Sequence, residues 1–119
     1  MKWQFRNDAP IYTQLIEQII VGIVTNIFPP GEKLPSVRDL AADAGVNPNT
    51  MQRALAELER QRLVHSQRTS GRMVTDDNER IFSAKRDLAQ SHIHQFLSAM
   101  NELGFTKDEI IHLLSEQDL

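Results

Sequence analysis

The chain has 119 residues, 40% of them hydrophobic and 24% charged, which is typical of a globular protein and not of a disordered or fibrous one. It contains no cysteine, which excludes disulfides and thiolate metal sites, and it has no apolar run long enough for a membrane span or a signal peptide. We therefore expect a cytoplasmic protein with no membrane partner. The net charge is −3, from 13 basic and 16 acidic residues, and taken alone it argues against a polyanionic partner such as DNA.

The first half of the chain predicts two helices followed by a tight turn. Apolar residues recur at spacings of three and four after Pro10, which indicates an amphipathic helix that must end before Pro29-Pro30-Gly31. Ser36 is a good N-cap for a second, short helix, and Gly45 is a good residue to end it. Because Asn47-Pro48 signals another helix start almost at once, the pair has the pattern of a helix-turn-helix.

The next elements complete a winged helix. A third helix is predicted from Pro48 to about Gln61, with one apolar side and one polar, partly basic side. Residues 63–67 and 72–75 alternate as short strands around the polar tip 68–71, which indicates a β-hairpin. We therefore predict a mainly α protein with a small β-hairpin wing.

A second region is predicted after the polar stretch that ends at Asp77. Helical spacing runs from Ile81 to Leu103, and Thr106 begins a last helix with a capping box to Glu109. The long helix exceeds what so small a domain can cover. We therefore expect a winged helix-turn-helix domain over residues 1–77 and a two-helix tail over residues 78–119.

The polar side of the third helix has the chemistry of a DNA-reading surface. Arginine can bind guanine, asparagine or glutamine can bind adenine, and a threonine methyl can contact thymine. Arg38 and Ser36 lie at a helix N-terminus, which favours a phosphate, and basic residues flank the predicted wing tip. The predicted DNA contacts are Ser36, Arg38, Asn47, Asn49, Thr50, Gln52, Arg53, Arg68, Gly71 and Arg72.

Other functions leave weaker traces in the sequence. His92 and His94 diverge around a helix, so they predict no metal site. No Gly-rich phosphate loop or activated nucleophile is present, so neither an enzyme nor a cofactor is expected. The rival interpretation is a winged helix used as a protein-interaction module that binds DNA only incidentally, and the presence of a small-molecule effector stays open.

Residues 10–74 resemble the winged-helix domain of GntR-type bacterial transcription regulators. Four stretches carry the resemblance: Pro10 to Leu15, Pro29 to Ala41, Val46 to Met51, and Arg53 to Glu59. The resemblance implies that Arg38, residues 47–50, Arg53 and Gly71 contact operator DNA. Two departures from the family are visible: Arg62 stands where a glycine is common at the end of the third helix, and the wing tip has one glycine where many relatives have two.

The short tail, with Leu103 to Ile111 after a long helix, resembles the YtrA subfamily, whose helical tails pair two subunits and whose members often repress transporter operons. The resemblance implies a homodimeric repressor, and two-fold symmetry then predicts a palindromic operator. The predicted dimer contacts are apolar residues of the tail: Phe82, Leu88, Ile93, Phe96, Leu97, Met100, Ile110 and Leu114.

The distribution of charge removes the objection to DNA. Residues 1–77 contain nine basic and nine acidic side chains, whereas residues 78–119 contain four basic and seven acidic ones. The whole deficit of three charges therefore lies in the tail, outside the predicted DNA-binding domain.

Overall fold

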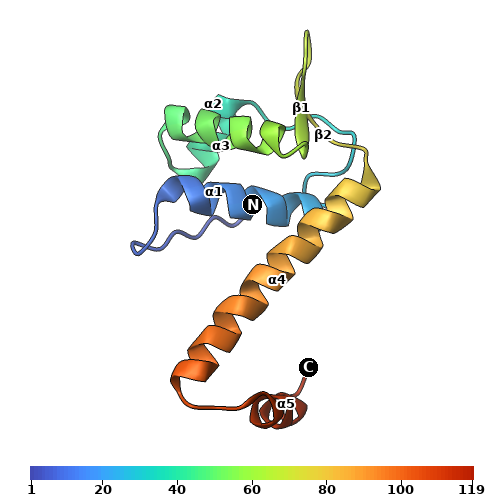
Figure 1. Cartoon of the computed structure of the whole chain (residues 1–119). Helices are drawn as coiled ribbons and strands as arrows, with labels where there is room; N and C mark the ends of the chain where they lie inside the picture. Colours follow the sequence, from blue (N-terminus) through green and yellow to red (C-terminus); the bar gives the residue numbers. More distant parts are fainter. The chain divides into compact units, whose positions relative to one another are not determined.

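The elements follow one another as three helices, a hairpin and two further helices, and the computed structural model describes all 119 residues. Their bounds are α1 (Ile11–Val24), α2 (Val37–Ala44), α3 (Pro48–Arg60), β1 (Val64–Gln67), β2 (Gly71–Val74), α4 (Asn78–Glu102) and α5 (Lys107–Ser115). The predicted fold class, mainly helical with a β-hairpin wing, is confirmed (Figure 1).

The chain divides into two compact units, residues 1–86 and residues 87–119. The division lies inside α4, which begins in the first unit and ends in the second. The first turns of α4 belong to the first unit because Ala84 is 5% exposed in its core and Ile81 packs against that core. The boundary after Asp77 stays a prediction; it lies at the start of α4, before this division.

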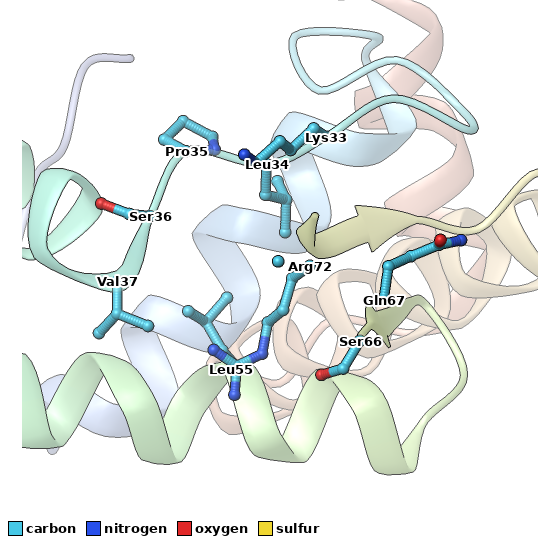
Figure 2. A pocket seen from close by; sticks show the side chains of 10 residues that line it. Lys33, Leu34, Pro35, Ser36, Val37, Leu55, Ser66, Gln67 and Arg72 are labelled. Atoms are coloured by element: carbon cyan, nitrogen blue, oxygen red, sulfur yellow. The ribbon is translucent and has the colours of Figure 1, made fainter. Parts of the chain in front are cut away.

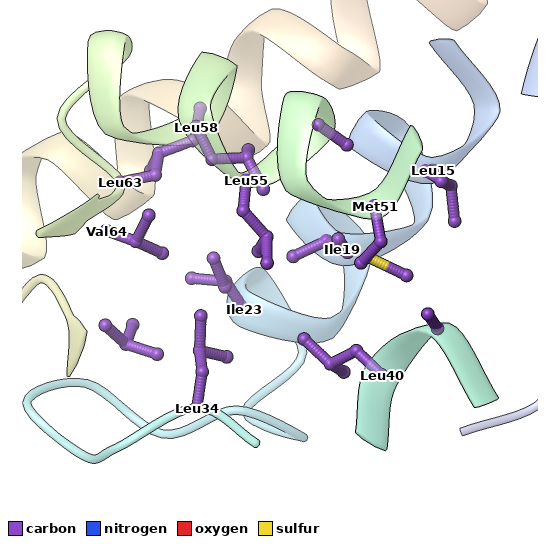
Figure 3. Packing of buried hydrophobic residues seen from close by; sticks show 14 residues of the cluster. Leu15, Ile19, Ile23, Leu34, Leu40, Met51, Leu55, Leu58, Leu63 and Val64 are labelled. Atoms are coloured by element: carbon purple, nitrogen blue, oxygen red, sulfur yellow. The ribbon is translucent and has the colours of Figure 1, made fainter. Parts of the chain in front are cut away.

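One apolar core holds the first unit together, and α1 and α3 contribute most of it (Figure 3). Figure 3 shows Leu15, Ile19 and Ile23 of α1 facing Met51, Leu55 and Leu58 of α3. All six side chains are at most 1% exposed, as their spacing of three and four residues predicts. The same cluster includes Leu34, together with Leu40 and Ala41 of α2 and Val64 and Val74 of the hairpin.

The helix-turn-helix forms through local capping bonds. The Ser36 hydroxyl oxygen accepts a hydrogen bond from the Asp39 N–H at 3.1 Å, and the Asn47 side-chain oxygen accepts one from the Asn49 N–H at 2.7 Å. Gly45 ends α2 in the left-handed conformation, with φ 71°. These three residues fix the starts of α2 and α3 and the turn between them, as the sequence predicts.

The end of α3 uses the same kind of cap without glycine. Arg62 has φ 63°, its N–H donates to the carbonyl of Glu59, and the Leu63 N–H donates to the carbonyl of Leu58. This pair of bonds is the Schellman motif, with the buried Leu63 and Leu58 as its apolar partners. Arg62 therefore takes the left-handed position in which glycine is the usual residue of such a cap.

The wing is wider than the predicted hairpin. β1 and β2 pair antiparallel, with Val64 opposite Val74 and Gln67 opposite Gly71. The segment before α2 pairs with β2, because the Leu34 N–H donates to the Arg72 carbonyl and the Val74 N–H donates to the Glu32 carbonyl, both at 2.9 Å. The loop that leads into α2 is therefore fixed to the wing.

The second unit contains the rest of α4 and α5. Thr106 and Glu109 form the predicted capping box, in which each side chain bonds the backbone N–H of the other residue. Gly104, with φ 88°, lies in the turn between the helices. No helix of the chain combines the length and apolar character needed to cross a bilayer.

Candidate nucleic-acid interface

The candidate interface is built on the exposed side of α3. Asn49, Gln52, Arg53 and Ala56 are exposed there, whereas Met51, Ala54, Leu55 and Leu58 face the core. Thr50 is half-buried at the edge of this surface. The structure thus places polar side chains and one small residue together on the outside of a helix, as expected for a helix that approaches a DNA groove.

Arg53 lies over an aromatic ring of α1. Its guanidinium carbon is 4.6 Å from the centroid of the Tyr12 ring, a cation–π contact. The contact restricts the long arginine side chain, so that the orientation of its hydrogen-bond donors is partly fixed before any ligand arrives. Tyr12 was not among the predicted site residues, because the sequence does not reveal which arginine lies over an aromatic ring 41 positions away.

Arg72, a predicted DNA contact that flanks the wing tip, is already paired within the protein. Its Nε donates to Glu59 at 2.8 Å, a second guanidinium nitrogen lies 3.3 Å from the Gln52 oxygen, and its side chain is only 17% exposed. Ser66 donates to the same Glu59 carboxylate, and this bond, with the nearby Arg72, lowers the pKa of Glu59 below its usual value. Arg72 thus connects β2 to α3, and its charge is already balanced.

A second pair balances charge at the end of α3. Arg60 donates to Glu57 within the helix, and Gln61 donates to the same carboxylate at 2.8 Å. The hydrogen bond from Arg60 is the main reason that the pKa of Glu57 falls to about 2. Glu57 therefore stays ionised at neutral pH, and Arg60 offers little net charge to a phosphate.

Besides Arg53, the loop before α2, the first turn of α2 and the wing tip carry basic side chains that form no ion pair. Arg38 is exposed in the first turn of α2, Arg68 is exposed at the wing tip, and Lys33 is exposed in the loop that joins the wing. Lys33 was missed by the sequence interpretation, because nothing in the sequence showed that its loop pairs with β2. These three residues are the cations best placed to meet phosphates.

Lys33 borders a pocket of about 370 Å³ between the start of α2, α3 and the wing (Figure 2). Ser36 and Val37 line it from α2, Leu55 from α3, and Gln67 and Gly71 from the hairpin. In Figure 2 the Arg72 side chain extends from the hairpin toward α3 across this space. Gly71 has φ 82°, a conformation that favours glycine, whereas a Cβ built there would make only an ordinary contact with the Lys33 side chain, at 3.5 Å.

A helix-turn-helix with a polar second helix, followed by a hairpin that packs against that helix, defines a winged-helix DNA-binding protein. Residues 11–74 match the family described as bacterial regulatory proteins, gntR family. The chain therefore belongs to the GntR family of DNA-binding transcription regulators, a family of regulators and not of enzymes.

Known relatives extend the match over nearly the whole chain. The uncharacterised HTH-type regulator YhcF of Bacillus subtilis is 39% identical over 91% of this chain and 89% of its own length. The HTH-type transcriptional repressor YtrA of the same organism is 30% identical over 93% of this chain and 86% of its own. The solved structure of a GntR family regulator from Listeria monocytogenes is 38% identical, covers 96% of this chain and 100% of that one, and superposes with a TM-score of 0.87.

Proposed function

We propose that this protein is a homodimeric, cytoplasmic repressor that binds a palindromic operator, with the first unit contacting DNA and the second unit joining two copies. The similarity to the repressor YtrA supports the direction of regulation, and the unpaired apolar surface of the second unit supports the dimer. Two-fold symmetry of the protein requires a matching symmetry in the operator. An operon for a membrane transporter is the proposed target.

An apolar groove between α4 and α5 is the observation that carries the dimer. It has a volume of about 500 Å³ and is lined mainly by large apolar side chains. Four of them remain strongly exposed in the single chain: Ile93 at 48%, Phe96 at 40%, Ile111 at 53% and Leu114 at 50%. Water contact at so many apolar side chains is costly, and a second copy of the same groove would cover them.

The predicted dimer residues do not all serve the same purpose. Ile110 is 3% exposed in the single chain, so it is already covered within its own subunit. Leu88, Leu97 and Met100 are half-buried on α4, whereas Phe82 is 64% exposed in the first unit. We propose that Ile93, Phe96, Ile111 and Leu114 form the centre of the contact within the second unit, with Leu88, Leu97 and Met100 around it. Phe82, at the start of α4 in the first unit, would be a separate contact with the partner copy.

The proposed DNA contacts separate into two groups. Asn47, Asn49, Thr50, Gln52 and Arg53 would read base edges from α3. Ser36, Arg38, Arg68 and Gly71, together with Lys33, would meet the sugar–phosphate backbone. Arg72 would act indirectly, by holding the wing against α3 through Glu59.

The dimer is tested with a charge placed in the groove. Phe96→Glu should give monomers in sedimentation velocity, because an unpaired carboxylate would be buried at the contact. Gln95→Glu is the matched control, since it adds the same charge at the preceding position of α4, which is exposed. A Phe96→Glu protein that remained dimeric would move the contact away from this groove.

The DNA contact is tested by selecting bound sequences from random duplexes and measuring affinities at fixed salt. We expect a palindromic consensus, and Arg53→Ala should weaken binding to it by about 1–3 kcal/mol and relax the preference at one position per half-site. An affinity that falls equally for all sequences would show that Arg53 contacts only the backbone. Binding that hardly depends on salt would instead favour a protein-interaction module.

A further inference from the structure

The first nine residues form an arm that two glutamines of α1 hold in place. The Gln14 side chain accepts from the Arg6 N–H at 2.8 Å and donates to the carbonyls of Arg6 at 2.9 Å and Ala9 at 2.8 Å. One turn further on, the Gln18 side chain accepts from the Gln4 N–H at 3.2 Å and donates to its carbonyl at 2.7 Å. The two side chains thus bond alternate residues of the arm, as a neighbouring strand would.

The intervening arm residues face the protein. Trp3 and Phe5 stack with their centroids 6.2 Å apart and an angle of 10° between the rings, and both pack against the core cluster. Gln14 is the one buried polar residue of the chain, at 5% exposure, and its polar atoms are satisfied by the arm. The arm therefore belongs to the folded first unit.

Trp3 connects this arm to α2. Its Nε1 donates to the Asp43 carboxylate at 2.8 Å, across 40 positions of sequence. Asp43 lies in the last turn of α2, and Arg38 lies in its first turn. The arm therefore contacts the helix that presents a proposed phosphate contact.

Because α2 is short, this bond matters for the orientation of the helix. The helix has eight residues; Leu40 and Ala41 are buried, and Val37 and Ala44 are partly buried against the core. Asp43 and Arg38 are five residues apart, or about 140° around the helix axis at about 100° per residue, on opposite sides of the buried edge. The bonded loop before α2 holds its N-terminal end and the Trp3 bond holds its last turn, so the two together limit rotation of this short helix about its axis.

We propose that Trp3 is a positioning residue for DNA binding, because its hydrogen bond to Asp43 holds α2 in the rotation that presents Arg38 to a phosphate. This inference rests on the proposed contact between Arg38 and the DNA backbone. It assigns a role in operator affinity to a segment that lies outside the matched residues 11–74 and carries none of the proposed contacts itself.

The test is a double-mutant cycle in operator affinity, measured at several salt concentrations. Trp3→Phe keeps an aromatic ring to stack on Phe5 but removes the donor, and it should weaken binding about fivefold and reduce the salt slope by about 0.9, the share of one phosphate. In an Arg38→Ala background the same change should have less than a twofold effect, because the side chain that it positions is gone.

Asp43→Asn is a second route to the same bond and carries an opposing control. Neutralising an acidic residue of a DNA-binding unit should strengthen binding by simple electrostatics. If Trp3 positions α2 through Asp43, the operator affinity of Asp43→Asn should instead fall about twofold to threefold, because an amide oxygen is a weaker acceptor than a carboxylate. Thermal unfolding of each variant identifies any loss of fold, and Asp43→Asn carries the test if Trp3→Phe does not fold.

The outcomes are separable. If Arg38→Ala weakens binding while Trp3→Phe binds as the wild type, or if the two losses simply add, the positioning role is refuted and the Arg38 contact survives. If Arg38→Ala binds as the wild type, the backbone contact in the proposed function is itself wrong. Tighter binding by Asp43→Asn would also overturn the role of Trp3.

Discussion

Arg62 occupies a backbone conformation that glycine adopts at lower cost, so Arg62→Gly should stabilise the first unit. The residue has φ 63°, its side chain is exposed, and it forms no ion pair or side-chain hydrogen bond. The cap itself uses only backbone groups, because the N–H groups of Arg62 and Leu63 bond the carbonyls of Glu59 and Leu58. Replacing the side chain therefore removes strain without removing a contact.

The size of the effect follows from two opposing terms. The left-handed conformation costs an L-residue with a Cβ about 1–2 kcal/mol, whereas glycine loses about 0.5–1 kcal/mol more conformational entropy on folding. The net gain is about 0.5–1 kcal/mol. With an unfolding entropy of about 2.1 cal/mol/K per residue over residues 1–86, this gain raises the melting temperature by about 3–5 °C.

Thermal and urea unfolding, followed by circular dichroism, measure this gain, and two variants separate backbone strain from charge. Arg62→Ala removes the same charge but keeps a Cβ, so it should give no stabilisation. Asn26→Gly changes another left-handed residue, with φ 70°, but asparagine tolerates that conformation, so a smaller gain is expected. A melting temperature for Arg62→Gly at or below that of Arg62→Ala would refute the reasoning.

Three further predictions concern other parts of the first unit. The pKa of Glu59 is lowered in the folded state, so its bonds stabilise the fold above the ordinary pKa of 4.5 and lose that contribution as the pH falls below it. The difference in unfolding free energy between wild type and Glu59→Gln, measured with urea, should therefore shrink from pH 7 to pH 3. A difference that stays constant would contradict this. A Cβ on Gly22 would lie 2.7 Å from the Phe28 ring, so Gly22→Ala should cost about 1–2 kcal/mol in thermal unfolding despite the better helix propensity of alanine; a more stable variant would mean that the ring moves freely. Lys33→Gln should weaken binding to specific and random DNA by the same factor and lower the salt slope by about 0.9, whereas a loss confined to the operator would make Lys33 a base contact.

The sequence was sufficient for the local structure of this protein because its signals are local. Ser36, Asn47 and Thr106 cap the helices they were predicted to cap, and Gly45 ends α2. The apolar periodicity of α1 and α3 identified most of the core, since the apolar side of an amphipathic helix is the side that packs against other elements. The helix-turn-helix and the wing follow from these local signals.

Side-chain partners far apart in the sequence could not be predicted in the same way. Arg72 and Arg68 look equivalent as wing residues, but only the fold shows that Arg72 meets Glu59 and that Arg68 has no ion partner. The roles of Tyr12, Lys33 and Trp3 likewise depend on contacts made after the helices have packed. Periodicity reports which side of a helix is buried, not which charge lies opposite another.

The segment that pairs with β2 joins the wing to the start of α2 within the first unit. Because residues 32–34 are bonded to β2 and lead directly into α2, a shift of β2 relative to the first turn of α2 would strain these bonds. Two DNA contacts that are joined in this way require a particular separation between the phosphates they meet. A duplex whose groove width gives another separation must deform to fit. Operator selectivity can therefore include base pairs that no side chain touches.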